Sequence, residues 1–540
     1  MTVKKNYLLA LLSAFLLWLA WPPIPYTAPL LWVAFVPLLL ALETIMRSDY
    51  RKKGTKVFLL SGLTGLLWNT ASIYWVFNAM NAVMPVYVAM FVALIPFGLS
   101  AVLMAFAFRL YYQLRKRYAI GWSFAGLVCF WIAYEYLHQT WDLAFPWMTL
   151  GNGFADTHQL VQWYEYTGVY GGTVWIWATN ILAFLVVLSA KDGFAPAHRR
   201  KLSAALAALI VVPSAWSLYR YATYEEYENP SNVVVAQPNV DPYGKFSFIT
   251  PEAQLDNLIR LSESVAQPNT EFFVWPETAI AAQGGYNEED FLRHPFFPRI
   301  QAFLTAYRNG NILSGIESYL IYSSPETPTA REYNGIYYDA FNAAVLIENS
   351  PKLQFYHKSK LVAGVEQFPF GGALAFMKPL FKAFGGTTGG YGRQDKPSVF
   401  YSQSGIGAAP VICYESIWGD YVAQYVKQGA QFIAVVTNDG WWGNTSGKDQ
   451  HLAYAKLRAI ETRRWVARSA NTGISAFINQ RGDVVQQTTW WVPAALKQDI
   501  NLNEEITFYV TAGDYLAYAG CVGSLVFALL ALSTRWKRSN

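Results

Sequence analysis

Cys413 is the side chain with the clearest potential for chemistry. It follows an apolar run, Pro410-Val411-Ile412, that predicts a strand, and it is followed by Tyr414, Glu415 and a predicted helix from about residue 418. A strand-to-helix turn presents a nucleophile well, and a thiolate is a strong nucleophile. An isolated free cysteine is more often a buried structural residue. Cys413 is therefore a candidate nucleophile, with a structural thiol as the alternative.

Two further side chains have the types that a reacting thiol needs. Glu277 follows a predicted buried strand, Phe272-Phe273-Val274, and a proline. A thiol is mostly protonated at neutral pH, so a carboxylate at this place can take its proton and later return it to a leaving group. Lys358 can stabilise the oxyanion of a tetrahedral intermediate. Taken singly, Glu277 is more often a helix N-terminal or surface acid, and Lys358 a solvated lysine.

Other chemistries have no support in the sequence. There is no HExxH, no paired CxxC, no Walker loop and no GxSxG, and the six His residues are scattered. The three Cys residues are too few for a disulfide framework and too widely spaced for a metal knuckle. The net charge of +5 is small for this length. We therefore expect no metal, no cofactor and no nucleic acid partner.

Much of the chain is apolar enough to lie in a membrane. Hydrophobic residues make up 53% of it and charged residues only 14%, which is unusual for a soluble domain. A helix that crosses a bilayer needs about 20 apolar residues. The first apolar run is interpreted as an uncleaved span, because no small-x-small cleavage site follows it. Eight spans are predicted, at residues 7–22, 28–45, 57–77, 83–108, 119–137, 168–189, 202–219 and 515–533.

Basic residues lie on alternate connections between these spans, and the positive-inside rule assigns that side to the cytoplasm. The opposite connections, such as residues 141–163, are aromatic and nearly free of Lys and Arg. The prediction is a seven-span domain at 1–220, an extracytoplasmic domain at 221–514, and an eighth span with a cytoplasmic tail at 515–540. The basic groups lie at residues 4–5, 47–56, 115–117, 199–201 and 535–538.

Residues 221–514 have an ordinary polar composition, in which short β-branched or aromatic runs alternate with helical patterns. This alternation predicts an α/β sandwich. The expected strands lie at 233–235, 272–274, 343–347, 410–412, 432–436 and 474–478, and the expected helices at about 251–265, 418–428 and 450–467.

Four motifs follow one another in this domain. Trp275-Pro276-Glu277 comes first, then Lys358 with Glu366 eight residues later, then Cys413-Tyr414-Glu415, then residues 437–443. This order resembles the nitrilase superfamily with its Glu-Lys-Cys triad. With the spans added, nearly the whole chain resembles the apolipoprotein N-acyltransferase family. The resemblance implies a polytopic α-helical membrane protein of eight spans with an extracytoplasmic α/β nitrilase-like sandwich domain.

The same resemblance implies roles for the residues that match the motifs. Glu277 is expected to be the general base, Lys358 the oxyanion stabiliser and Cys413 the nucleophile. Glu366 is expected to support the lysine and an incoming amine. The other supporting residues are Tyr414 and Glu415 beside the cysteine, and Asn342 near the active site.

The implied reaction is a ping-pong acyl transfer through a thioester. The acyl donor is a phospholipid, expected to be phosphatidylethanolamine, and the acceptor is the α-amine of a diacylglyceryl cysteine at an apolipoprotein's N-terminus. The implied location is a bacterial inner membrane, with the catalytic domain on the periplasmic side and the C-terminus in the cytoplasm. Two alternatives stay open: a membrane-anchored amidase on small molecules, which would not need eight spans, and a catalytically dead membrane scaffold.

The chain departs from the family pattern at two places. Phe246 stands where the family usually has Trp, and Ala363-Gly364-Val365-Glu366 stands where it has Pro-Phe-Gly-Glu. Neither change removes a proton carrier or the nucleophile, so both concern the acyl chain and the substrate entrance. Residues 368–384 are rich in Phe, and they are expected either to form a lid on the outer leaflet or to pack inside the domain.

Overall fold

The computed structural model describes residues 3–82, 84–245, 248–367, 369–370 and 390–533. Phe246 and most of the predicted lid, residues 368 and 371–384, lie outside the described residues. The chain divides into two compact units. The helical unit comprises residues 1–81, 85–223 and 514–540, and the α/β unit comprises residues 82–84 and 224–513.

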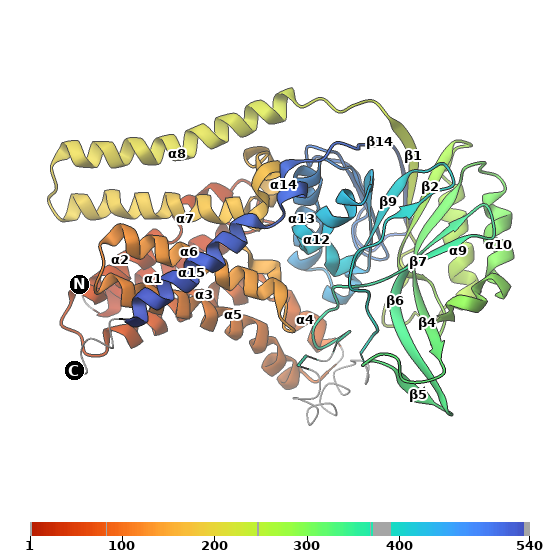
Figure 1. The fold of residues 1–540 in the computed structure, drawn as a ribbon, viewed down its shortest axis with the longest axis horizontal. Helices are drawn as coiled ribbons and strands as arrows, with labels where there is room; N and C mark the ends of the chain where they lie inside the picture. Colours follow the sequence, from red (N-terminus) through yellow and green to blue (C-terminus); the bar gives the residue numbers. More distant parts are fainter. Residues whose placement is uncertain (1–2, 83, 246–247, 368, 371–389, 534–540) are drawn as a thin grey trace. The chain divides into compact units, whose positions relative to one another are not determined.

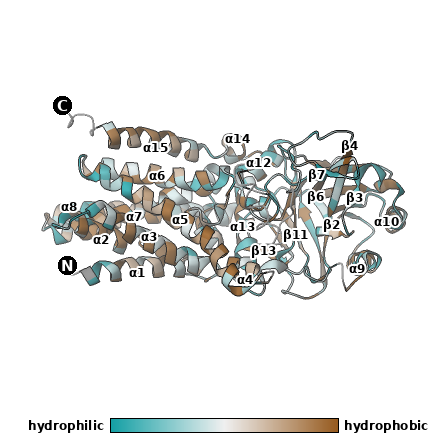
Figure 2. Cartoon of the chain, turned by 90° about the horizontal axis from the view of Figure 1, so that it is seen from below, coloured by the Kyte–Doolittle hydropathy of each residue, from teal (hydrophilic) through white to brown (hydrophobic). Residues whose placement is uncertain are grey.

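The helical unit is built mainly from long apolar helices (Figure 1). Several of them, α15 among them, carry mostly hydrophobic residues (Figure 2). Large apolar side chains remain exposed on the outside of the helices, for example Leu8, Phe91 and Leu525. The helices are α1 (Val3–Leu19), α2 (Val36–Arg47), α3 (Lys53–Ser72), α4 (Trp75–Asn81), α5 (Val86–Arg115), α6 (Ile120–Thr140), α7 (Tyr164–Lys191), α8 (Pro196–Thr223) and α15 (Tyr515–Ser533).

The number of membrane crossings depends on whether the bent pair α3–α4 and the short helix α1 are each counted as a span. Within the described residues, six helical stretches are long and apolar enough to cross a bilayer. Helices α3 and α4 form a pair bent by 61° that would make a seventh. Helix α1 has 17 residues, somewhat fewer than the roughly 20 that a full crossing needs. All eight predicted segments fall on helical structure, and the count of eight spans stays a prediction.

The interior of the helical unit is aromatic and includes a buried carboxylate. Phe35 stacks on Trp177 at 4.5 Å between ring centroids, and Trp131 meets Trp177 edge-on at 5.1 Å. Glu135 accepts hydrogen bonds from the Trp131 indole at 2.9 Å, the Leu150 backbone at 2.8 Å and the Thr173 hydroxyl at 2.8 Å. These hydrogen bonds replace the ones to water that the carboxylate loses on burial. They also hold the connection after α6 against α7.

The α/β unit contains two β-sheets that face each other. Phe272 of the first sheet meets Phe432 of the second at 5.0 Å between ring centroids, in the apolar layer between them. The first sheet has the order β14-β1-β2-β4-β6-β5, with β3 beside β4 and β7 beside β6, and the second has the order β13-β12-β11-β10-β9-β8. The strands of the first sheet are β1 (Pro230–Gln237), β2 (Thr270–Ile280), β3 (Tyr286–Asn287), β4 (Asn311–Tyr322), β5 (Arg331–Tyr333), β6 (Ile336–Glu348), β7 (Leu353–His357) and β14 (Ala494–Asn501). The strands of the second are β8 (Phe400–Tyr401), β9 (Gly407–Ile412), β10 (Phe432–Thr437), β11 (Val466–Ala470), β12 (Ala476–Ile478) and β13 (Val484–Gln487).

Helices cover the outer face of each sheet, which completes the predicted α/β sandwich. Helices α9 (Pro251–Glu263) and α10 (Phe296–Leu304) lie on the first sheet (Figure 1). Helices α12 (Gly419–Lys427) and α13 (Ser446–Thr462) lie on the second. The central strands β1, β2 and β4 run parallel, as do β9, β10 and β11. Parallel strands within a sheet end at the same edge, and Glu277 near the end of β2 and Cys413 just after β9 each lie toward such an edge.

One predicted helix has the wrong boundaries. The pattern at about 450–467 was expected to be helical throughout, but α13 ends at Thr462. Arg463 follows it with a left-handed backbone, φ 49°, which stops the helix. Residues 466–470 instead form strand β11, which pairs with β10 and β12 at the centre of the second sheet. Pairing on both sides outweighs the local helical periodicity.

Candidate active site

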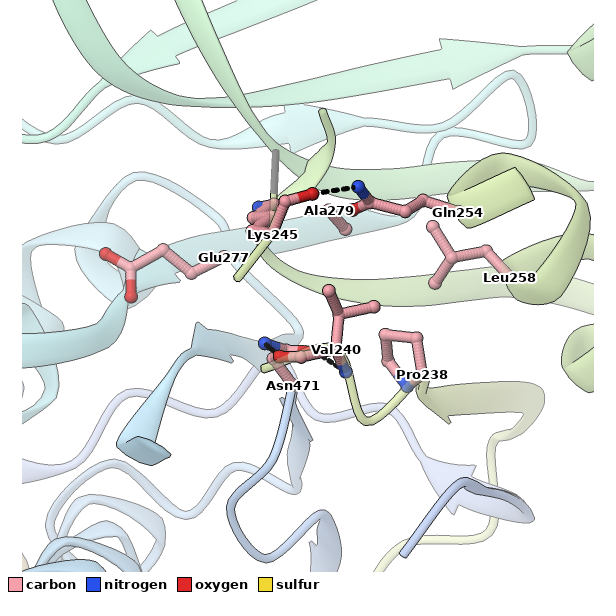
Figure 3. A pocket seen from close by; sticks show the side chains of 8 residues that line it. All are labelled: Pro238, Val240, Lys245, Gln254, Leu258, Glu277, Ala279 and Asn471. Atoms are coloured by element: carbon pink, nitrogen blue, oxygen red, sulfur yellow. Dashed lines mark hydrogen bonds between the residues drawn. The ribbon is translucent and has the colours of Figure 1, made fainter. Parts of the chain in front are cut away.

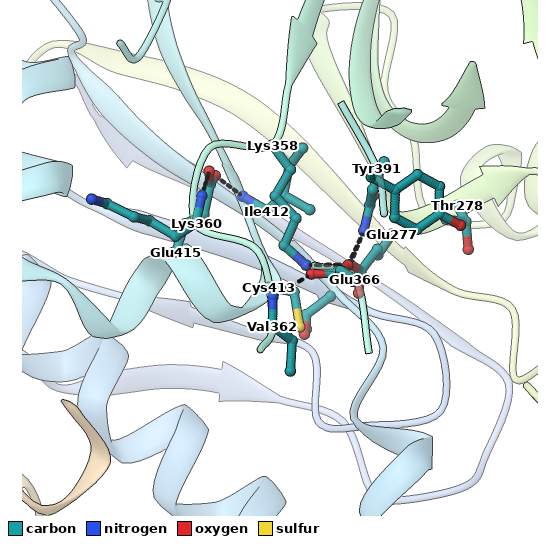
Figure 4. A network of polar contacts seen from close by, with 12 residues as sticks. Glu277, Thr278, Lys358, Lys360, Val362, Glu366, Tyr391, Ile412, Cys413 and Glu415 are labelled. Atoms are coloured by element: carbon teal, nitrogen blue, oxygen red, sulfur yellow. Dashed lines mark hydrogen bonds and ion pairs between the residues drawn. The ribbon is translucent and has the colours of Figure 1, made fainter. Parts of the chain in front are cut away.

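Glu277 lies on an irregular stretch of β2. The regular pairing of β2 with β4 is interrupted between Trp275 and Ile280, and Thr278 has a left-handed backbone, φ 51°. Gly315 of β4 packs against this stretch so closely that a Cβ there would lie 2.5 Å from the Cα of Glu277. Over this stretch β2 advances from Trp275 to Ile280 while β4 advances only from Ser314 to Ile316, and an interruption of this kind re-aims side chains. It directs the Glu277 carboxylate toward a polar cluster between the two sheets (Figure 4).

Cys413 lies at the turn that follows β9. It begins the short 3-10 helix η6 (Cys413–Ile417), and its backbone is left-handed with φ 48°. Its side chain is 8% exposed and faces the same polar cluster (Figure 4). Burial raises the pKa of the Cys413 thiol well above its usual range, the negative charge of Glu277 adds to the rise, and Lys358 opposes it. The thiol is therefore protonated at rest and needs a base before it can react.

Lys358 lies between two carboxylates just after β7. Its ammonium is 2.8 Å from Glu366 Oε1 and 3.2 Å from Glu277 Oε1, and its side chain is 1% exposed. Burial lowers the pKa of Lys358, but the charges of Glu277 and Glu366 outweigh burial, so that pKa lies well above the ordinary lysine value. Lys358 is therefore a permanent positive charge beside the sulfur of Cys413.

Asn342 ties the two carboxylates together. Its side-chain amide on β6 donates to Glu277 Oε1 and to Glu366 Oε1, each at 2.8 Å. Glu366 also accepts from the Val362 backbone at 2.8 Å through Oε2. The Asn342 carbonyl accepts from the Lys358 backbone at 2.9 Å. One asparagine thus orients the base, the second acid and the segment that carries the lysine.

Glu415 and Tyr414 follow the nucleophile in the chain, and both interact electrostatically with Lys358. Glu415 is fully buried, and its Oε2 accepts from the Ile412 backbone at 2.9 Å. Its Oε1 accepts from the Ser359 backbone at 2.7 Å and from the Tyr356 hydroxyl at 2.6 Å. The Tyr414 ring packs edge-on against Trp418 at 4.8 Å. Glu415 therefore joins the cysteine turn to the lysine segment, and Tyr414 is part of the buried wall beside them.

The fold thus gathers most of the residues that the motifs single out. Glu277, Lys358, Glu366 and Asn342 share one hydrogen-bonded network, and Cys413 interacts electrostatically with Glu277 and Lys358. Phe246 lies outside the described residues.

A buried ionic network that reaches the backbone carbonyl of Cys413 was not predicted from the sequence. Asp439 accepts from Arg468 at 2.6 Å and contacts His451 Nδ1 at 2.9 Å, and all three side chains are fully buried. His451 Nε2 reaches the Cys413 carbonyl at 3.2 Å and the Ser416 hydroxyl at 2.9 Å. Asp439 belongs to the fourth motif, whereas His451 was one of the scattered histidines. Only the packing of α13 on η6 brings the network to the cysteine.

Lys245 is a second residue that the sequence reasoning passed over. Its ammonium donates to the Thr278 carbonyl and, at 2.6 Å, to the Thr278 hydroxyl. It lines a small pocket together with Glu277 and Asn471 (Figure 3). No local pattern marks a lysine that will be buried, so this contact had no sequence signal.

Among the described residues, no group of three His, Cys, Asp or Glu side chains has the geometry to hold a metal ion. The polar cluster instead contains a thiol, a buried ammonium and two carboxylates. A thiol attacks a carbonyl, a carboxylate carries its proton, and a fixed ammonium stabilises the oxyanion that forms. The site can therefore perform acyl transfer through a thioester.

Two family models match the chain. Residues 13–182 match the apolipoprotein N-acyltransferase N-terminal domain, and residues 233–508, just over half of the chain, match the carbon-nitrogen hydrolase model. The chain therefore belongs to the carbon-nitrogen hydrolase family, and the N-terminal match places it with the apolipoprotein N-acyltransferases of that family.

Full-length relatives agree with this assignment. A protein of Chlorobaculum tepidum is 29% identical over 98% of this chain and 97% of its own length. A protein of Geobacter metallireducens is 29% identical over 98% of this chain and 95% of its own length. Both carry the name apolipoprotein N-acyltransferase. Among solved structures, a nitrilase-superfamily amidase from Nesterenkonia AN1 is 14% identical, with a TM-score of 0.36, over 55% of this chain and 99% of its own.

Proposed function

We propose that this protein transfers an acyl chain from a phospholipid to the N-terminal α-amine of S-diacylglyceryl-cysteine in apolipoproteins. The observation that carries the proposal is the buried cluster in which Lys358 bridges Glu277 and Glu366 beside the thiol of Cys413. The match to N-acyltransferase relatives over nearly the full chain supports the choice of substrates. The same relatives give the membrane-anchored amidase no support.

In the first half-reaction, Cys413 attacks an ester carbonyl of the phospholipid. Glu277 takes the thiol proton as the sulfur–carbon bond forms, and the Lys358 ammonium stabilises the resulting oxyanion. Both hydrogen bonds that Glu277 receives from Asn342 and Lys358 end on Oε1, so Oε2 can accept the proton. When the carbon–oxygen bond breaks, Glu277 returns this proton to the departing lysophospholipid oxygen. The enzyme is left as a thioester.

In the second half-reaction, the α-amine of the lipoprotein attacks that thioester. Glu277 takes a proton from the amine, the carbon–sulfur bond breaks, and the proton returns to the sulfur of Cys413. Glu366 holds Lys358 in place throughout through its 2.8 Å contact. The burial of the thiol and the lysine limits access of water, which favours aminolysis over hydrolysis.

The proposal extends to the membrane. We infer eight spans, a catalytic unit on the periplasmic side of a bacterial inner membrane and a cytoplasmic C-terminus, because basic residues occupy alternate connections. Phosphatidylethanolamine is the proposed donor. A lipid donor and a lipid-modified acceptor both keep their acyl chains in a bilayer, so an enzyme for them needs a membrane domain.

Intact-protein mass spectrometry tests the reaction directly. The purified full-length protein is incubated with phosphatidylethanolamine alone, and a mass gain of one acyl chain is expected. Adding a synthetic diacylglyceryl-cysteine peptide with a free α-amine should remove the gain and acylate the peptide. Cys413→Ala should show neither change, while Cys129→Ala and Cys521→Ala, both on helices of the helical unit, should behave as the parent protein.

Each alternative has its own signature in this experiment. An amidase would release acid from a short amide and leave the peptide unmodified. A dead scaffold would acquire no mass from any donor. Acylation of the peptide by the Cys413→Ala protein would refute the thioester mechanism.

A further inference from the structure

Thr278, the residue after the proposed base, holds a backbone conformation that disfavours its side chain. Its φ of 51° lies in the left-handed region, where a β-branched residue is a clear outlier. The conformation belongs to the irregular stretch of β2, between Trp275 and Ile280, where the register against β4 shifts. Something other than the local preference of threonine must therefore hold this backbone conformation in place.

Lys245 supplies contacts that do so. Its ammonium donates to the backbone carbonyl of Thr278 and, at 2.6 Å, to the hydroxyl of the same residue. The Lys245 carbonyl accepts from the Gln254 side chain at 2.7 Å, which anchors the lysine to α9 (Figure 3). Two donors from one ammonium thus hold both the backbone carbonyl and the side chain of Thr278.

The charge of Lys245 is costly to bury. The side chain is 7% exposed, and burial lowers the pKa of Lys245 to about 8, with Glu317 and Glu277 opposing the fall. Burial also raises the pKa of Glu317, which accepts from the Tyr391 hydroxyl at 3.3 Å. A neutral side chain of similar length would fill this space without the desolvation cost. The Lys245 ammonium therefore has its donors on Thr278 and its charge near Glu277, the proposed base.

We propose that Lys245 is a positioning residue for acyl transfer: it holds Thr278 in the left-handed conformation and so fixes the direction in which Glu277 leaves β2. This inference rests on the proposed function of Glu277 as the base. It assigns a role to a residue whose ammonium donates hydrogen bonds to Thr278. Without these hydrogen bonds, Thr278 relaxes toward an extended backbone and Glu277 turns away from Cys413.

Four full-length variants in detergent test the inference: Lys245→Met, Thr278→Gly, the double variant, and Lys352→Met as a matched lysine control with an exposed side chain. The measured quantity is the rate of acyl-enzyme formation at saturating phosphatidylethanolamine. Lys245→Met should be slower by about 100-fold, the loss typical of a base misplaced by about 1 Å. Glycine adopts left-handed φ freely, so Thr278→Gly should restore at least tenfold of that loss in the double variant. Lys352→Met should match the parent.

Rescue by a conservative variant separates positioning from simple loss of fold. Lys245→Gln, which keeps a donor without the charge, should be faster than Lys245→Met. The donor concentration for half-saturation should not change in either variant.

Three results would overturn the inference: a normal rate in Lys245→Met, a double variant no faster than Lys245→Met, or a rate that falls only in proportion to folded protein. Alkylation of Cys413 by iodoacetamide, in a Cys129→Ala and Cys521→Ala background, repeats the comparison without lipid. If the parent protein gains no acyl mass, the proposed substrates are wrong. The alkylation rates then still decide whether Lys245 positions the base.

Discussion

The carboxylate of Glu415 accepts a hydrogen bond of 2.7 Å from the backbone of Ser359, a residue 56 positions away in the chain. Through its other oxygen, Glu415 accepts from the backbone of Ile412, immediately before the nucleophile. A single buried side chain therefore sets the distance between the turn that carries Cys413 and the segment that carries Lys358. Burial raises the pKa of Glu415, and hydrogen bonds from Tyr356 and the two backbone amides oppose the rise.

Glu415→Gln should weaken both stability and activity. One carboxylate oxygen becomes an amide NH₂, which cannot accept from a backbone N–H, so at least one buried donor loses its partner. The free energy of unfolding should fall by about 1–3 kcal/mol, and acyl-enzyme formation should slow because the lysine moves relative to the thiol. Urea unfolding and single-turnover mass spectrometry measure the two effects. Glu504→Gln, at an exposed hydrogen bond with Gln431, is the control, and an unchanged stability in Glu415→Gln would contradict the role given to Glu415.

Lys358→Met should slow acyl-enzyme formation by about 10²–10³-fold, the usual effect of removing one oxyanion donor. The substitution also leaves Glu277 and Glu366 without the cation between them. Lys358→Arg keeps the charge but places it differently, so it should recover only part of the rate. Circular dichroism checks the fold of each variant. A parent-like rate in Lys358→Met would exclude the lysine as the oxyanion stabiliser.

Protonation of Asp439 should lower the stability of the α/β unit as the pH falls into the acid range. Burial pushes the pKa of Asp439 up, but Arg468 and His451 outweigh burial and lower that pKa to about 2, from 3.8. A depressed carboxylate pKa contributes stability that is present above the unfolded value and is lost as pH falls through the folded value. The contribution is about 2 kcal/mol. Unfolding free energies from pH 6 to pH 2 should therefore fall more steeply for the parent than for Asp439→Asn.

The comparison between these two proteins cancels the titration of the other carboxylates. Asp439→Asn should also be less stable near neutral pH, because Arg468 is left buried beside a neutral side chain. Parallel pH curves for the two proteins would show that Asp439 does not carry this charge interaction.

The proposed membrane orientation predicts which residues an impermeant thiol reagent reaches in intact cells. In a protein whose three native cysteines are replaced by alanine, a cysteine at Arg293 of the α/β unit should be labelled. Cysteines at Lys52 and Arg199, on basic connections, should be labelled only after the membrane is opened. Labelling of Lys52→Cys or Arg199→Cys in intact cells would show that the basic connections do not lie on the cytoplasmic side.

Much of the candidate site follows from local patterns. Glu277 and Cys413 were recognisable because each follows an apolar strand run, and a chain that leaves a buried strand turns at the sheet edge. The packing of the two sheets on each other then brings both residues to one polar cluster. Lys358 and Glu366 were identified by their order relative to these motifs, and their contact at 2.8 Å is a result of the fold.

Other features could not be predicted from the sequence because they depend on contacts between segments that are distant in the chain. The helix expected at about 450–467 ends at Thr462, since β11 gains hydrogen bonds on both sides by joining the second sheet. Local periodicity cannot weigh that gain.

The apolar helices, the α/β alternation and the residue types of the reaction could all be predicted from the sequence, because hydrophobic spacing and strand-end positions are local properties. Three contacts are visible only in the folded chain: Lys245 binds Thr278, Asn342 bridges two carboxylates, and His451 reaches the Cys413 carbonyl. Each of these polar groups is stable in a buried place only because a partner from another part of the chain satisfies it, and burial of that kind leaves no mark on the neighbouring sequence.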